Sequence, residues 1–71
     1  MQQKRLLVLA AGILQVPVIK KAKEMGIYVI AVDGDPNAVG LKYADKAIVV
    51  NITSEEDVLK VAREEQIDGV I

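Results

Sequence analysis

Residues 5–33 read RLLVLAAGILQVPVIKKAKEMGIYVIAVD, and this stretch decides the fold class. It begins with an unbroken apolar run, which is typical of a strand buried on both faces of a parallel sheet. Gly12 interrupts the run, and residues 16–25 then have the spacing of an amphipathic helix that stops at Gly26. Residues 27–32, which are rich in β-branched side chains, predict a second buried strand. Together these segments predict a β-α-β unit with parallel strands.

The rest of the chain continues the alternation. Residues 33–37 (DGDPN) are turn-forming, residues 41–44 predict one helical turn, and residues 46–50 predict an edge strand. A second helix begins near Thr53 or Ser54, either of which can cap it, and residues 67–71 predict a fourth strand. The sequence therefore predicts an α/β fold. We expect a three-layer, Rossmann-like doubly wound parallel sheet of about four strands in the order 3-2-1-4, with one helix on each face.

The apolar spacing also predicts which side of each helix is buried. The first helix has an apolar stripe of Leu14, Val18, Ala22 and Met25. The second has a stripe of Val58, Leu59 and Ala62, with Val61 at its margin. Lys20, Lys21 and Lys23 are expected to form a solvated face, and the acidic residues 55–57 to mark a helix start rather than a metal site.

Composition excludes several classes of protein. The chain has 71 residues, which is too short for a multidomain enzyme. Hydrophobic residues make up 52% of it, which is too large a share for a disordered chain. The net charge of −1 and the two Tyr as the only aromatics argue against nucleic-acid binding. Without Cys or His, only carboxylates remain as metal ligands, and no clustered set predicts a metal site. The longest apolar runs are too short for a membrane span, so a cytoplasmic protein is expected.

The last four residues, DGVI, look like the start of a strand. We therefore expect residues 1–71 to be a single, truncated domain of a longer protein. Two helices cannot cover both faces of a four-stranded sheet. Pairing with another domain or with a second copy is therefore expected.

Ligands of such sheets bind at the carboxyl ends of the strands, near the point where the strand order reverses. The loop after the first strand lies there, and the backbone N–H groups of Gly12, Ile13, Leu14 and Gln15 are candidates for holding an anion. Asp33 ends the second strand, where an acid binds ribose in dinucleotide folds. The alternative is that Gly12 serves only the turn and that Asp33 is a turn former or helix cap. No catalytic residue is predicted.

Several stretches together resemble a known family. They are LLVL at residues 6–9, AAGILQVP at 10–17, IKKAKEMG at 19–26, YVIAVD at 28–33, DPNAVG at 35–40 and ADK at 44–46. They resemble the N-terminal domain that precedes the ATP-grasp fold in biotin carboxylase, carbamoyl-phosphate synthase large subunits and the purine-pathway carboxylate ligases. The sequence looks closest to carbamoyl-phosphate-synthase-like ATP-grasp proteins, and the resemblance covers essentially the whole chain.

The resemblance implies a cytoplasmic ligase that uses ATP and Mg²⁺ to turn a carboxylate into an acyl phosphate, which an amine then attacks. The ATP and metal residues of the family lie in later domains, so this chain alone is not expected to be catalytic. It implies a substrate-side role for residues 12–15 and Asp33. The implied partners are a small-molecule carboxylate, C-terminal ATP-grasp domains and a second copy. The family's glycine-rich loop matches residues 10–12, where this chain has Ala10 and Ala11.

Two other functions remain open from the residues. One is a Rossmann-type module that binds NAD or coenzyme A, although the first loop has one glycine where the G-x-G-x-x-G fingerprint has three. The other is a non-catalytic assembly domain.

Overall fold

The structure is a computed structural model, and it describes residues 3–71. Its strands are β1 (Arg5–Leu9), β2 (Tyr28–Asp33), β3 (Lys46–Val49) and β4 (Gly69–Val70). Its helices are α1 (Val16–Glu24) and α2 (Glu55–Glu64), with two short 3-10 helices, η1 (Ile13–Gln15) and η2 (Val39–Tyr43). The predicted helical turn near residues 41–44 is therefore η2.

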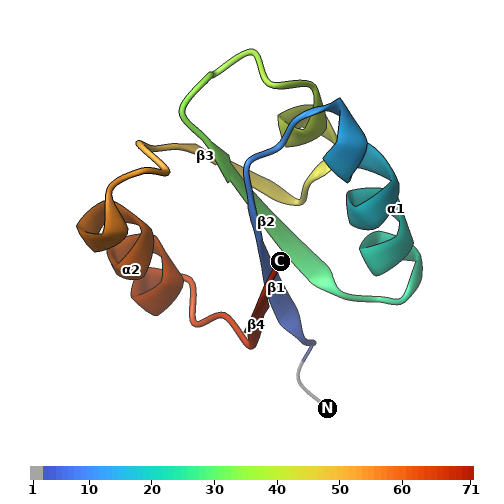
Figure 1. Cartoon of the computed structure of the whole chain (residues 1–71). Coiled ribbons are helices and arrows are strands. Elements are labelled where there is room, and N and C mark those ends of the chain that lie inside the picture. Colours follow the sequence, from blue (N-terminus) through green and yellow to red (C-terminus); the bar gives the residue numbers. More distant parts are fainter. Residues whose placement is uncertain (1–2) are drawn as a thin grey trace.

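The strands form one parallel sheet in the order β3-β2-β1-β4, as predicted (Figure 1). In the register of the central pair, Leu7 lies beside Ile30 and Leu9 lies beside Val32. The fourth strand is shorter than expected, but its backbone pairing continues beyond it. The N–H of Ile71 donates to the Leu7 carbonyl at 3.0 Å, and its carbonyl accepts from the Leu9 N–H at 2.9 Å.

The two helices cover opposite faces of the sheet, because successive strand residues point to opposite sides (Figure 1). On one side Val8 and Val29 pack in a cluster with Ile19 and Ala22 of α1. On the other side Leu7 and Ile30 pack in a cluster with Val61 of α2. This confirms the doubly wound arrangement.

The predicted buried stripe of α1 is partly wrong: Ala22 is buried and Val18 is half-buried, but the two ends of the stripe are exposed. Leu14 is 87% exposed and Met25 is 66% exposed, whereas the buried residues of α1 are Val16, Ile19 and Ala22. Leu14 belongs to η1, which has a different number of residues per turn from an α-helix, so its phase does not continue into α1. Met25 lies beyond the last residue of α1.

The predicted stripe of α2 is also partly wrong. Val61 is the buried residue of this helix and Leu59 is 45% exposed, while Val58 and Ala62 are partly buried against the same cluster. The buried positions continue to residue 65, following the i, i+3, i+4, i+7 spacing of a helix face. A glutamate occupies that last position, so the apolar pattern alone does not show the face.

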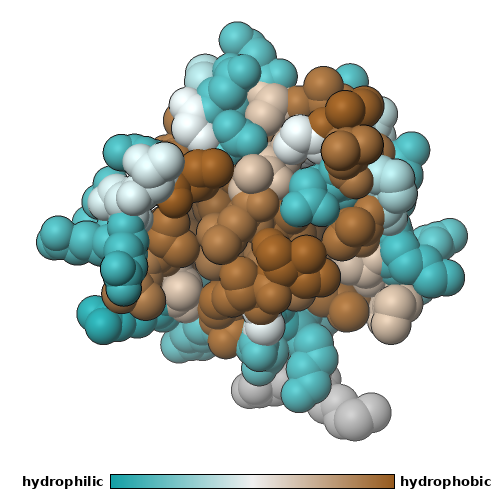
Figure 2. All heavy atoms as spheres, in the orientation of Figure 1, coloured by the Kyte–Doolittle hydropathy of each residue, from teal (hydrophilic) through white to brown (hydrophobic). Residues whose placement is uncertain are grey.

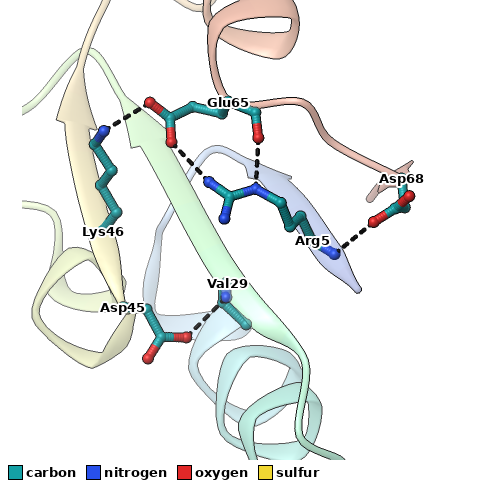
Figure 3. A network of polar contacts seen from close by, with 6 residues as sticks. All are labelled: Arg5, Val29, Asp45, Lys46, Glu65 and Asp68. Atoms are coloured by element: carbon teal, nitrogen blue, oxygen red, sulfur yellow. Dashed lines mark hydrogen bonds and ion pairs between the residues drawn. The ribbon is translucent and has the colours of Figure 1, made fainter. Parts of the chain in front are cut away.

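Glu65 joins α2 to the sheet (Figure 3). Its side chain is 11% exposed and pairs with Arg5 of β1 at 3.1 Å and with Lys46 of β3 at 2.7 Å. The Arg5 guanidinium also lies 4.4 Å from the centre of the Tyr28 ring. These contacts hold the C-terminal end of α2 across three neighbouring strands. Ser54, one of the two predicted caps, precedes α2, and its hydroxyl accepts from the Asp57 N–H at 3.3 Å.

Candidate functional site

The candidate site is the carboxyl edge of the sheet, where the loop after β1 meets the end of β2. We call residues 10–15 the β1 loop. The N–H of Ala10 donates to the Val32 carbonyl at 2.9 Å, so the loop starts in register with β2. Asp33 ends that strand. The structure thus brings together the site residues that the sequence predicted on two separate segments.

Ala11 is held from both sides of its backbone. A carboxylate oxygen of Asp33 accepts from the Ala11 N–H at 2.8 Å. The Ala11 carbonyl accepts from the Gly40 N–H at 2.7 Å. Ala11 itself is fully buried. Two connections far apart in the sequence therefore fix where the β1 loop leaves the sheet.

Gly40 is a residue of this site that sequence reasoning missed. A Cβ atom at position 40 would lie 2.7 Å from the Ala11 carbonyl oxygen, closer than real Cβ atoms approach. Only glycine allows η2 to pack this tightly against the β1 loop. The stretch DPNAVG at residues 35–40 contains this glycine, but no local pattern shows which part of the chain it touches.

The alternative that Gly12 serves only the turn does not fit its conformation. Its backbone is extended, with φ −69° and ψ 177°, a conformation that any residue adopts. A Cβ atom there would meet nothing within 4 Å. The left-handed residue of the loop is Ala10, with φ +67°. The open space beside Gly12 leaves its backbone accessible to a ligand.

The rest of the β1 loop presents backbone donors and apolar side chains. Ile13 is 64% exposed and Leu14 is 87% exposed, and Gln15 is half-buried. Among residues 3–71, no hydrogen bond joins the N–H groups of Gly12, Ile13 or Leu14 to another protein group. The loop can therefore contribute backbone hydrogen bonds and apolar contact to a ligand, while its own side chains carry no charge.

Asp33 has a structural role that explains its position. One carboxylate oxygen accepts from the Asp35 N–H at 2.9 Å, which shapes the turn after β2, and the other accepts from Ala11. The N–H groups of Asp35 and then of Ala11 hold the pKa of this carboxyl below its usual value of 3.8. Asp33 is therefore ionised at neutral pH and acts as a turn former, one of the predicted alternatives. A contact between Asp33 and a ligand remains a prediction.

Residues 3–71 contain no group of three or more Asp, Glu, His or Cys residues arranged to hold a metal ion. Within the same residues, neither helix is long and apolar enough to cross a membrane.

Comparison with known proteins identifies enzymes with the same region. No protein-family model matches the sequence. Formate-dependent phosphoribosylglycinamide formyltransferase from Methanocella arvoryzae is 34% identical over 67 residues, which cover 94% of this chain and 16% of that protein. The enzyme of the same name from Prochlorococcus marinus is 30% identical over 69 residues, which cover 97% of this chain and 18% of that protein.

Two solved structures share the fold. Glycinamide-RNase-transformylase T from Mycobacterium tuberculosis aligns with a TM-score of 0.89 and 30% identity, over 94% of this chain and 19% of its own. Phosphoribosylglycinamide synthetase from Anaerococcus prevotii aligns with a TM-score of 0.83 and 36% identity, over 97% of this chain and 18% of its own. The chain thus spans under a fifth of the length of each protein. All are ATP-grasp enzymes, and this chain matches the N-terminal domain of an ATP-grasp ligase.

Proposed function

We propose that this chain is the substrate-side N-terminal domain of an ATP-dependent carboxylate ligase, and that it is not catalytic alone. The observation that carries the proposal is the match in both sequence and fold to ATP-grasp enzymes over at least 94% of the chain. The open backbone of the β1 loop at the carboxyl edge supports a ligand-facing role. We place the protein in the cytoplasm, where small-molecule ligases have ATP available.

In the proposed reaction, a carboxylate oxygen of the substrate attacks the γ-phosphorus of ATP and ADP leaves. An amine then attacks the acyl carbon, loses a proton, and releases inorganic phosphate. We assign ATP and Mg²⁺ to residues beyond this chain, because the ATP and metal residues of the family that the sequence resembles lie in later domains. The role proposed for this chain is to orient the substrate through the N–H groups of Gly12, Ile13 and Leu14. Such groups can hold a carboxylate or phosphate without a charged side chain.

The activity is tested on the natural protein with a panel of small carboxylates. We expect ADP release that depends on one class of carboxylate, and a hydroxamate when hydroxylamine replaces the amine, because hydroxylamine traps acyl phosphates. ADP release that is independent of every carboxylate, with no hydroxamate, contradicts the proposal. Saturable binding of NAD that is lost in Asp33→Asn would favour a dinucleotide-binding module instead.

The role of the β1 loop is tested by Gly12→Val in the same protein. The valine Cβ enters open space and the backbone is already extended, so the melting temperature should stay near that of the parent. The branched side chain blocks ligand approach, so kcat/KM for the substrate should fall by about tenfold or more. Gly12→Ala is the matched control and should have a smaller effect. Unchanged kcat/KM in Gly12→Val would show that the loop does not face the substrate.

A further inference from the structure

We propose that the groove between α1 and η2 binds a compact, multiply charged phosphoryl anion. We call it the lysine groove. It is open to solvent and has a volume of about 790 Å³, and its lining includes Lys20, Lys21, Lys23, Lys42 and Tyr43. It shares no lining residue with the β1 loop or with Asp33, so it is separate from the candidate site above.

The lysine side chains of the groove are arranged around one aromatic ring. The ammonium nitrogen of Lys20 lies 4.8 Å from the centre of the Tyr43 ring, and that of Lys42 lies 5.4 Å from it. Both distances are short enough for cation–π contacts. One ammonium group from α1 and one from η2 therefore lie against the same ring. Lys20 is exposed, as the sequence predicted, and its ammonium group also lies against an aromatic ring.

Lys23 fixes a further part of the groove. Its ammonium group donates to the Tyr43 carbonyl at 3.0 Å and lies 3.9 Å from Asp45. Asp45 is itself anchored, because its other carboxylate oxygen accepts from the Val29 N–H at 2.8 Å (Figure 3). The wall of the groove is thus tied to β2, and Lys23 is the one groove lysine with a carboxylate partner among the described residues.

The charge of the groove is opposite to that of the whole chain. The chain has nine Lys and Arg residues and a net charge of −1. Four of its lysines line this groove, and among residues 3–71 Glu24 is the only carboxylate in the lining. Like charges gathered in one concave region raise the local concentration of anions. The gathering also costs repulsion energy, which a bound anion would relieve.

The side-chain chemistry selects the class of anion. Lysine acts as a compact point charge that binds phosphate, whereas planar carboxylates are better matched by the arginine fork, and no arginine lines the groove. The Tyr43 ring already carries two ammonium groups, so it offers little surface for stacking a nucleobase. The ligand is therefore recognised by its phosphoryl groups.

The test is calorimetric titration of the full chain with sodium tripolyphosphate. The double variant Lys20→Gln/Lys42→Gln removes the two ammonium groups on Tyr43. The matched control, Lys60→Gln/Arg63→Gln, removes the same charge from α2. We expect saturable binding that weakens about tenfold or more in the first variant and less than about twofold in the control. Equal weakening in both variants, or no saturable binding in the parent chain, overturns the proposal.

A second titration separates the sources of phosphoryl groups. ADP and pyrophosphate are compared on the same chain, because they share two phosphoryl groups and differ in the nucleoside. Affinities within about threefold of one another support recognition of phosphoryl groups alone. Binding of ADP more than about tenfold tighter than pyrophosphate contradicts it. In the parent chain, ligand binding should change the amide chemical shifts of residues 20–24 and 42–43, and the first variant should lose these changes together with its affinity. Chemical-shift changes confined to other residues also overturn the proposal.

Discussion

Ala11 is the residue on which the candidate site depends, because its N–H donates to the Asp33 carboxylate and its carbonyl accepts from the Gly40 N–H. Its burial leaves no room for the backbone to shift without opening the core. The position of the whole β1 loop is therefore set by two residues outside it.

Gly40→Ala tests this close approach. The added Cβ would lie 2.7 Å from the Ala11 carbonyl oxygen, so η2 must move away, at a cost of about 1–3 kcal/mol. Gly12→Ala is the matched control, because its Cβ meets nothing within 4 Å, and it should change the free energy of unfolding by less than about 0.5 kcal/mol. Urea unfolding measures both. Similar costs for the two variants would contradict the described packing.

Ala10 is the strained residue of the loop, with φ +67°. The left-handed conformation costs a residue with a Cβ roughly 1 kcal/mol, so Ala10→Gly should stabilise the fold by about that amount. The control is Ala47→Gly in β3, where glycine only adds freedom to the unfolded chain and should destabilise by up to about 1 kcal/mol. Urea unfolding that shows Ala10→Gly to be as destabilising as the control would disprove the strain.

Asp33 should make the free energy of unfolding depend on pH in the acidic range. Its pKa lies below 3.8 because the N–H groups of Asp35 and Ala11 bind the ionised form. The ionised carboxylate therefore stabilises the fold above that pH, and the contribution is lost as the pH falls through the lowered pKa. Carboxyl ¹³C NMR titration measures the pKa directly. A value for Asp33 at or above 3.8 would show that these hydrogen bonds do not form.

The sequence located Gly12 and Asp33 at the correct edge but could not assign their roles. Strand ends and loops follow from local patterns, so both residues were placed by their distance from the apolar runs. The contact between Ala11 and Gly40 joins segments that are distant in sequence. No pattern along the chain encodes such an approach. The residue with left-handed backbone in the loop is Ala10, and an alanine does not indicate this conformation in a sequence as a glycine does.

At the scale of elements, the two helices show where apolar periodicity succeeds and where it fails. Their existence and their placement on opposite faces were predicted correctly. Their buried sides were predicted only in part, because η1 precedes α1 with a different periodicity and because the inward position just after α2 is a glutamate, Glu65. A side chain that is buried through ion pairs is indistinguishable in sequence from a solvated one.

Alanine substitution in α2 tests its buried side. Val61 is 7% exposed and Leu59 is 45% exposed. Val61→Ala should lower the free energy of unfolding by about 1–3 kcal/mol, whereas Leu59→Ala should lower it by less than about 1 kcal/mol although it removes more atoms. Thermal or urea unfolding of the two variants decides. A larger effect at Leu59 would restore the apolar stripe that the sequence predicted.

At the scale of the whole molecule, apolar surface remains uncovered beside β4. A groove there is lined by apolar side chains including Leu6, Met25, Ile27 and Ile71. Figure 2 shows apolar side chains gathered at the centre of the face that carries the C-terminus in Figure 1. Two helices on a four-stranded sheet leave part of one face open, as the length of the chain predicted.

We expect this surface to be covered in the natural protein, either by ATP-grasp domains or by a second copy. Sedimentation of the 71-residue chain should therefore show reversible association as its concentration rises, because isolated apolar surface associates. Met25→Lys, which places a charge in the groove, should weaken that association. A strict monomer at every concentration would remove the second copy as a partner.

The central claim is that this chain is one domain of an ATP-grasp ligase. The intact mass of the protein purified from its source tests that claim most directly. We expect a product several times longer than this chain, because the relatives that the chain matches are about five to six times its length. A natural product that ends at Ile71 would contradict the account.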